Sequence, residues 1–509
     1  MRISKWFFIL TMLSLGSILW AQSATIRVPG DAPTISDAIS QASSIINGSA
    51  PRDVGIKVDP GTYQGPFNLS PLNNPNYSVS LVAAQGPSVT RLIRSDCCWV
   101  LQGSGVRNFT LDGFQVSNHN DDPLNVASQG MRLNDSTNIT VQNCSFDVDW
   151  QAMLFNVYDP ALSSRVQVVN NFVIAGNPNE TYPDVYGPAV TMQIIMYNPS
   201  LSTGEHRLIV ADNTFRTAAS AVRFFYNVYD ENGNQVGYAP GGTLEMVRND
   251  VTSWFAAGHN LGGGHNHHVA ANRIHDGQVG FYNFCGGSGV WENNVLYNNV
   301  QGAIFGNYQV CYGANWVAIS VPVTGEKRII RHNTIVNNQG AGLIYLDDGL
   351  PHDPLPVLYN NIIAFNDYSG IVTLLEDAVN SLQMYMPFNL SLDRNDVFAN
   401  TLSGLTDSTF FGLTGTVGKP GANYSGIVPN GKDMSVEPGF YDSVRRDFSL
   451  KKNSKLVNAG LVSLPVPLRD FVLNQRDPKP DIGAYEYVEA PNLNVRANPA
   501  NRGKGPKTD

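Results

Sequence analysis

A short pattern of apolar and polar positions recurs along most of the chain: an apolar stretch, an asparagine, one variable residue and another apolar residue. The asparagines of the clearest copies are Asn213, Asn249, Asn272, Asn294, Asn333, Asn361 and Asn395. Asp112, Asn143 and Asn171 precede this series in similar settings, and successive members lie 22 to 42 residues apart. A minimum near 22 with longer intervals is typical of a solenoid whose coils carry loop insertions.

The pattern predicts an all-β fold, a single-stranded parallel β-helix. Each coil contributes short strands, and strands of neighbouring coils pair about 4.8 Å apart. The residue two places after each asparagine is apolar, from Phe215 to Val397, so we expect it to face the core. We expect the asparagines to stack along one turn and to bond to the backbone there.

Both ends of the chain resemble a known family. Residues 26–42 and 56–69, IRVPGDAPTISDAISQA and IKVDPGTYQGPFNL, resemble the N-terminal cap and first coil of secreted proteins of the pectin-lyase-like superfamily. NDVFAN, ANYSGI, VEPGFYDSVRRDFSLKKNSKLVNAG and RDPKPDIGAYEY resemble, in order, the closing segment of its choice-of-anchor Q type. The resemblance implies a right-handed β-helix with an N-terminal capping helix, in which Ile35, Ala38, Ile39 and Ala42 keep the helical spacing after Asp31 or Thr34.

Three regions are expected along the chain. Residues 1–23 have a basic start, an apolar centre and a small-residue end, which is typical of a signal peptide. Residues 24–488 form the β-helix domain, and residues 489–509, rich in Pro, Asn and Gly, are expected to be disordered. We therefore expect a secreted or extracellular monomer, with the periplasm or cell surface as alternatives and no membrane association after cleavage.

A net charge of −9 argues against nucleic acid and anionic membranes as partners. It also disfavours a polyanionic substrate unless a local basic groove or a bound cation compensates.

The register predicts one candidate active site. Positions one and three after the asparagine should face solvent, which places Arg273, His275 and Tyr297 on one exposed face with Arg216 two coils away. In a β-elimination, Arg273, Arg216 or a bound Ca²⁺ would neutralise a substrate carboxylate, and His275 or Tyr297 would act as base and acid.

The segment GHNLGGGHNHH, residues 258–268, concentrates four histidines. We expect His265, His267 and His268 to line a substrate trough between long loops, with a metal site or structural polarity as the alternatives. His259 falls in a column of apolar residues and is expected to face the core.

Two pairs of acidic residues, Asp347 with Asp348 and Glu376 with Asp377, occupy nearly equal positions in adjacent coils. Such carboxylates could bind Ca²⁺ or act as the catalytic pair of a retaining glycosidase. The alternative is an ordinary solvent-facing turn.

The leading hypothesis is a polysaccharide lyase or a related uronan-modifying enzyme with an extracellular glycan as its substrate. The resemblance supplies this reaction class, whereas the residue roles come from the register. The alternatives are a non-catalytic protein that binds glycan or has a structural role at a surface, and a retaining glycoside hydrolase.

Overall fold

A computed structural model describes residues 23–489. The gaps within this range are 96–97, 120–127, 177–188, 198–203, 218, 231–234, 239–240, 254–255, 262–265, 285–287, 308–309, 313–317, 321–326, 348–353, 378–381, 386–387, 389, 403–415, 418–421 and 428–430. The expected signal peptide, apart from Ser23, and the expected tail, apart from Glu489, lie outside the described residues.

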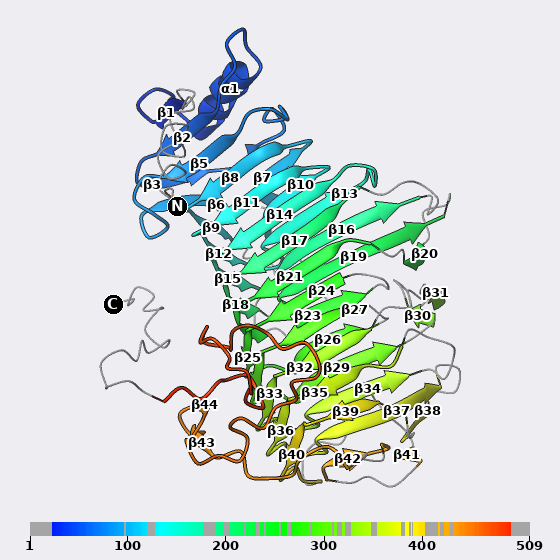
Figure 1. Cartoon of the computed structure of the whole chain (residues 1–509). Coiled ribbons are helices and arrows are strands. Elements are labelled where there is room, and N and C mark those ends of the chain that lie inside the picture. Colours follow the sequence, from blue (N-terminus) through cyan, green and yellow to red (C-terminus); the bar gives the residue numbers. More distant parts are fainter. Residues whose placement is uncertain are drawn as a thin grey trace, which may run out of the picture.

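The chain forms a right-handed parallel β-helix with three sheets along its sides (Figure 1). Sheet A contains β1 (Ala24–Val28), β2 (Val54–Val58), β5 (Val79–Ala83), β8 (Arg107–Asp112), β11 (Thr137–Gln142), β14 (Ser164–Val169), β17 (His206–Ala211), β21 (Thr243–Val247), β24 (Asn266–Ala270), β27 (Ser288–Glu292), β32 (Arg328–Arg331), β35 (Val357–Tyr359) and β39 (Ser391–Asp393).

Sheet B contains β3 (Gly61–Gln64), β6 (Thr90–Arg94), β9 (Gln115–Asn118), β12 (Ser145–Val148), β15 (Phe172–Ala175), β18 (Thr214–Thr217), β22 (Asp250–Ser253), β25 (Arg273–His275), β28 (Val295–Tyr297), β33 (Thr334–Val336), β36 (Ile362–Ala364) and β40 (Asp396–Phe398).

Sheet C contains a parallel series: β4 (Phe67–Asn68), β7 (Cys98–Ser104), β10 (Ser128–Asn134), β13 (Met153–Val157), β16 (Val190–Met196), β19 (Val222–Tyr229), β23 (Ala256–Leu261), β26 (Val279–Phe284), β29 (Gln301–Asn307), β34 (Leu343–Asp347), β37 (Ile371–Asp377) and β42 (Tyr424–Ser425). Short strands join its margin: β20 (Gln235–Tyr238), β30 (Val310–Tyr312), β31 (Ala318–Ser320), β38 (Leu382–Tyr385) and β41 (Thr416–Val417). A separate hairpin pairs β43 (Phe440–Asp442) with β44 (Asp447–Leu450).

The predicted capping helix is present as α1 (Ile35–Ile46), at one end of the solenoid (Figure 1). Thr34 is its N-cap, since its side chain accepts a hydrogen bond from the Asp37 amide at 3.1 Å. The four residues predicted for its apolar face are all buried. They close the open end of the core.

The predicted asparagine stack runs unbroken from Asn171 to Asn395. Each Nδ2 donates to the Oδ1 of the next asparagine at 2.8–3.0 Å, and Asp433 accepts from the last one. The residues two places later are buried from Phe215 to Val397, as predicted. The first two anchors, Asp112 and Asn143, were misplaced. The stack positions in their coils are held by Phe114 and Cys144, and Asn143 comes one residue before Cys144. Asp112 pairs in register with Gln142 instead.

A second asparagine stack on the next turn was not predicted. It links Asn299, Asn338, Asn366, Asn400 and Asn423. Its members from Asn299 to Asn400 lie five residues after the anchors from Asn294 to Asn395, so the sequence carried the signal.

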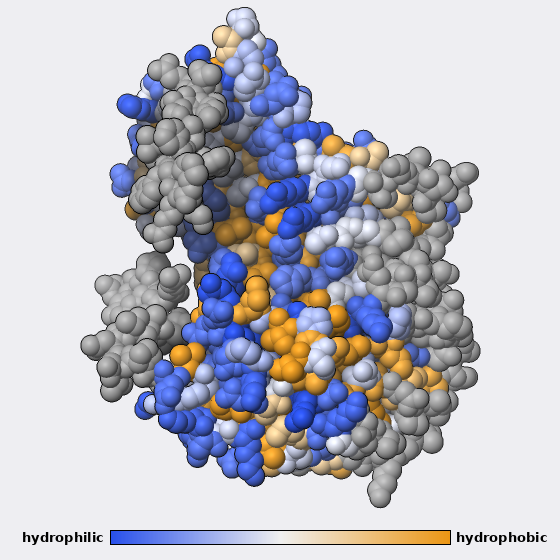
Figure 2. All heavy atoms as spheres, viewed as in Figure 1, coloured by the Kyte–Doolittle hydropathy of each residue, from blue (hydrophilic) through white to orange (hydrophobic). Residues whose placement is uncertain are grey.

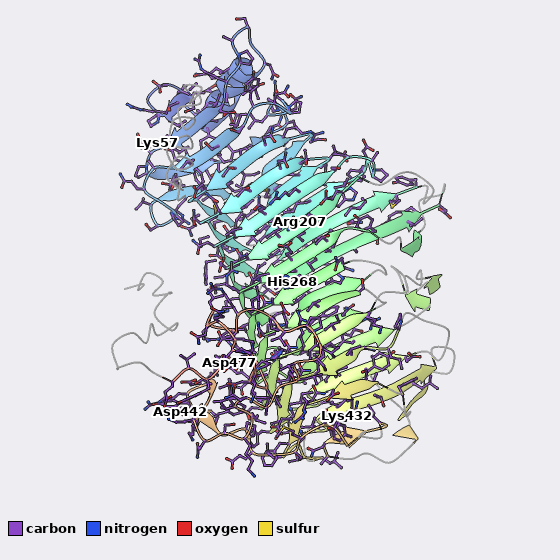
Figure 3. The ribbon with its side chains drawn as sticks, in the orientation of Figure 1. Lys57, Arg207, His268, Lys432, Asp442 and Asp477 are labelled. Atoms are coloured by element: carbon purple, nitrogen blue, oxygen red, sulfur yellow. The ribbon has the colours of Figure 1, made fainter. Side chains whose placement is uncertain are left out.

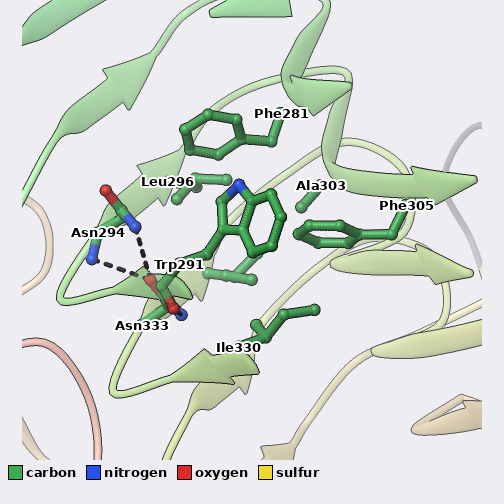
Figure 4. A pocket seen from close by; sticks show the side chains of 9 residues that line it. Phe281, Trp291, Asn294, Leu296, Ala303, Phe305, Ile330 and Asn333 are labelled. Atoms are coloured by element: carbon green, nitrogen blue, oxygen red, sulfur yellow. Dashed lines mark hydrogen bonds between the residues drawn. The ribbon is translucent and has the colours of Figure 1, made fainter. Parts of the chain in front are cut away.

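The interior is a continuous apolar column, and a small cavity lies near its middle. Trp291 lies between Phe281 and Phe305 there, and Asn294 and Asn333 of the first stack form its polar side (Figure 4). The side chains that line the cavity are all buried and form part of the core.

The C-terminal segment, residues 432–489, lies against the outside of sheet B over the last coils (Figure 1). Phe440, Phe448, Leu456 and Ile482 pack on outward-facing side chains of β28, β33 and β36, which makes a second apolar core. Arg476 locks the segment in place: it bonds to Glu486 at 2.9 Å and to Asn293 at 2.8 Å, with almost no exposed surface.

Candidate functional site

The three residues predicted to be catalytic share one face of sheet B. His275 pairs with Tyr297 in register, and their rings stack with centroids 5.0 Å apart. The predicted register is therefore correct. The predicted exposure is wrong, because Tyr297 is 3% exposed and His275 is 9% exposed.

The C-terminal segment is the reason for this burial. Phe448 packs on Tyr297 with ring centroids 5.3 Å apart, and the Arg446 guanidinium lies 5.2 Å above the same ring. Arg273 lies 5.5 Å above the ring of Phe471. The predicted active-site face is thus an internal packing surface along its C-terminal part.

His275 stands at the margin of this cover, between two carboxylates. Its Nδ1 lies 2.6 Å from Asp276 Oδ2, and its Nε2 lies 3.3 Å from Asp250 Oδ1. Arg216 pairs with Asp250 at 2.9 Å, and Arg446 pairs with Asp276 at 3.0 Å.

This network has clear electrostatic consequences. Burial of the Asp250 carboxyl opposes ionisation, but the hydrogen bond from His275 and the charge of Arg216 hold its pKa at about 2. Burial likewise opposes ionisation of Asp276, yet His275 and Arg446 lower its pKa. Because both imidazole nitrogens face carboxylates, neither is free to take a proton from a substrate. The arrangement favours a structural latch for the C-terminal segment rather than a general base.

The histidine-rich segment divides between the two faces of sheet A. His268 lies on the outer face of β24, on the same sheet as Arg207 of β17 (Figure 3), and its Nε2 lies 3.0 Å from Glu292 Oε1. His267 points inward: it is 2% exposed and its ring lies 5.8 Å from that of Trp291. The expectation that His267 lines an exposed trough is therefore wrong, because strand alternation places it on the core side with Val269.

The other two histidines of the segment have different outcomes. His265 lies outside the described residues. His259 was expected in the interior column with Phe281, but Gly258 pairs with Phe281 instead, and His259 pairs with Arg223 and Tyr282. The expected register was wrong by one residue.

The predicted acidic cluster does not assemble from the described side chains. Asp347 is 3% exposed and accepts a hydrogen bond from the Tyr345 hydroxyl at 2.8 Å. It pairs in register with Leu375 rather than Glu376, so it cannot share an outer site with that residue. Asp348 and the side chains of Glu376 and Asp377 lie outside the described part. Among the described residues, no group of three His, Cys, Asp or Glu side chains could hold a metal ion.

The outer face of sheet C carries a polar surface that the sequence reading missed. On β10 and β13 it presents Arg132, Asn134 and Asn156, and Tyr158 follows β13. Arg132 donates to Asn134 Oδ1 and to the Tyr158 hydroxyl, both at 3.3 Å. Asn156 Nδ2 donates to the same two oxygens, at 3.1 and 3.5 Å. We call these four residues the Arg132 network.

The polar surface continues across the next two strands. Gln193 of β16 lies beside Asn156, and Asn227 of β19 donates to the Tyr229 hydroxyl at 3.2 Å. Tyr197, 61% exposed, lies beside Tyr229 with ring centroids 6.0 Å apart. Alternation with the buried Met192, Ile194 and other core residues could have identified this face.

The chain can be compared with known protein families, curated proteins and solved structures. No protein-family model matches the chain, and no curated protein matches it significantly. Among solved structures, the catalytic domain of a GH87 α-1,3-glucanase in complex with nigerose is 13% identical over 81% of this chain and 69% of that chain, with a TM-score of 0.48. The Agl-KA catalytic domain is 12% identical over 82% and 69%, with a TM-score of 0.42. Pectate lyase Pel9A is 13% identical over 91% and 96%, with a TM-score of 0.36.

Proposed function

We propose that this protein is an extracellular, carbohydrate-active β-helix protein that binds a polysaccharide on the outer face of sheet C. The single observation that carries the proposal is the polar surface running from the Arg132 network to Tyr197 and Tyr229. Amide and guanidinium groups pair with sugar hydroxyls and acidic substituents, and exposed aromatic rings stack on the apolar faces of sugar rings.

The strand arrangement suits an extended polymer. β10, β13, β16 and β19 are consecutive neighbours in sheet C, and paired strands lie about 4.8 Å apart. A glycan crossing these strands would meet one new set of outward side chains per strand. Tyr197 and Tyr229 would hold it by stacking at one end, and the Arg132 network would hold it at the other.

The reaction is the finer part of the proposal, and we retain β-elimination on a uronan as its leading form. The roles expected for Arg273, His275 and Tyr297 are not favoured by their buried, fully engaged positions. His259 is the better residue to test as a base, because its backbone register places it beside Arg223 in the row that continues from Arg132. Hydrolysis and binding without catalysis are the alternatives to β-elimination, and product analysis distinguishes them.

Secretion is part of the proposal and is supported by the composition of residues 1–23. No helix in the described part of the chain is long and apolar enough to cross a bilayer. The resemblance to the choice-of-anchor Q type likewise rests on the C-terminal sequence motifs alone.

Calcium binding remains a proposal for Asp348, Glu376 and Asp377, without Asp347. If Ca²⁺ binds there, a chelator should lower the melting temperature, and Asp348→Asn should remove that sensitivity. An unchanged melting curve in excess chelator would contradict it.

Binding and product chemistry test the central proposal together. The migration of the purified protein should be retarded in native gels that contain a polysaccharide to which it binds. Tyr197→Ala should weaken this retardation at least several-fold. Tyr441→Ala is the matched control, because Tyr441 is 51% exposed on the C-terminal segment. An unsaturated, ultraviolet-absorbing product would identify a lyase, and new reducing ends alone a hydrolase. Absence of binding to every polysaccharide in a broad panel would overturn the proposal.

A further inference from the structure

The hydrogen bonds within the Arg132 network leave an excess of donors. Asn134 Oδ1 and the Tyr158 oxygen each accept two hydrogen bonds from Arg132 and Asn156. The second terminal nitrogen of Arg132, the Asn134 amide nitrogen and the Tyr158 hydroxyl proton have no acceptor in the described part of the chain. Asn156 Oδ1 is the one amide oxygen of the network that accepts no hydrogen bond from the described residues, so unused donors outnumber unused amide acceptors.

Arg132 also differs from four of the outward-facing arginines. Arg207, Arg216, Arg248 and Arg331 each form an ion pair with a carboxylate of a neighbouring strand or turn. The partners of Arg132 within the described residues are an amide oxygen and a phenol, both neutral. The nearby Asp135 carboxylate is engaged elsewhere, since its Oδ1 accepts from the backbone amides of Tyr158 and Asp159 at 2.7 and 3.0 Å.

The network is both held in place and accessible. Asn156 is 4% exposed and fixes the two shared oxygens from below, whereas Tyr158 is 39% exposed and Arg132 and Asn134 are half-buried. A ligand reaching the network would therefore meet a positioned, donor-rich surface with a positive charge.

From this geometry we infer that the Arg132 network binds an anionic substituent of the glycan, either the carboxylate of a uronic acid or a sulfate ester. Both groups are acceptor-only anions, and both match the planar fork of a guanidinium. The inference rests on the proposed glycan-binding function and names its substrate class: an acidic polysaccharide, bound despite the net charge of −9 because Arg132 forms no ion pair within the described residues.

Matched pairs of polymers test the inference and separate the two sources of charge. Polygalacturonate is compared with its carboxyl-reduced form, and a sulfated galactan with its desulfated form, by calorimetric titration of the full-length mature protein. We expect at least tenfold tighter binding to the charged member of one pair, since a charge-assisted hydrogen bond is worth a factor of that order. The pair that shows the difference identifies the group.

Variants tie the effect to this residue. Arg132→Gln should abolish the preference for the charged member, and Arg132→Lys should retain part of it, with melting temperatures confirming that both variants fold. Arg165→Gln, an exposed arginine on sheet A, is the control and should leave the preference intact. Equal affinity for charged and neutral members would overturn the inference and leave glycan binding on sheet C standing. Failure to bind any of these polymers or a neutral glucan would count against both.

Discussion

The N-terminal and C-terminal halves of the β-helix differ in whether their outer faces are exposed or buried. On sheet C, one row of outward positions contains Arg132, Leu154 and Thr191 in the first half and Ile344 and Val372 in the second. The first members are polar or partly exposed, whereas the last two are fully buried. On the face drawn in Figure 2, hydrophilic side chains predominate over the upper coils, and more apolar side chains are exposed over the lower part.

Sheet B repeats the contrast with a visible cause. Its outward positions carry Asp147 and Arg216 in the first half, but Val295, Ile362 and other apolar residues in the second, under the C-terminal segment. Alternation gives every strand of the solenoid an inner and an outer face. Whether the outer face is exposed to solvent depends on the composition of its row of side chains. The proposed glycan-binding surface lies on the open half, whereas the C-terminal segment packs on the covered half.

The largest loss of stability is expected at Arg476, which holds the C-terminal segment against the β-helix. Arg476→Ala would leave the Glu486 carboxyl buried without its partner and remove the bond to Asn293, which should lower the free energy of unfolding by about 3–5 kcal/mol. Lys452→Ala, in an exposed pair with Glu489, is the control and should leave it nearly unchanged. Chemical denaturation measures both, and equal effects would show that the segment does not stabilise the fold.

A pH-dependent loss of stability is expected next. Burial raises the pKa of Asp396 to about 7, and the neighbouring Asp433 carboxylate adds to the shift. The stability linked to a protonated Asp396 is therefore present below its unfolded pKa near 4 and is lost as the pH rises through about 7. The loss is at most about 4 kcal/mol.

Asp396→Asn should flatten this dependence, because the amide cannot ionise. Melting temperatures of both proteins between pH 4 and 8 provide the measurement. The Tyr424 hydroxyl and Asp433 also face this site, and Asp396 accepts the Val436 amide at 2.9 Å. An unchanged pH profile in the variant would assign the dependence to other groups.

A smaller loss of stability is expected at His275, which lies at the edge of the C-terminal segment. His275→Ala removes hydrogen bonds to two carboxylates from a largely buried site and should cost about 1–3 kcal/mol. His268→Ala is the matched control, because His268 bonds to one carboxylate on an exposed face and its loss should cost less than about 0.5 kcal/mol. Glycan affinity should be unchanged by His275→Ala. A many-fold loss of affinity would restore His275 to the binding site.

The smallest stability change is expected on the open half. Tyr197→Ala removes a 61% exposed ring and should alter the free energy of unfolding by less than about 0.5 kcal/mol while weakening glycan binding. Strong destabilisation would show that Tyr197 packs the surrounding loops instead of holding a ligand.

The sequence predicted those features that depend on local pattern. The asparagine stack from Asn171, the buried position two residues later and the helix after Thr34 all follow from spacing and side-chain type. His267 could also have been placed correctly, because it lies two residues before the buried Val269.

The sequence could not show what packs on an outer face. Tyr297 and His275 were assigned to the correct face, yet residues about 150 positions later cover it, and strand alternation carries no information on such distant contacts. A partial signal was present, because Val295 and Ile362 are apolar at positions expected to meet solvent. The Arg132 network was missed because its residues lie on sheet C strands, outside the repeat around the asparagines.

Hydrogen exchange of the purified protein, with and without a saturating polysaccharide, locates the bound glycan on the molecule. We expect added protection to concentrate on β10, β13, β16 and β19, with none on β25 or β28 beneath the C-terminal segment. Protection confined to β25 and β28, or to the outer face of sheet A around His268, would contradict glycan binding on sheet C.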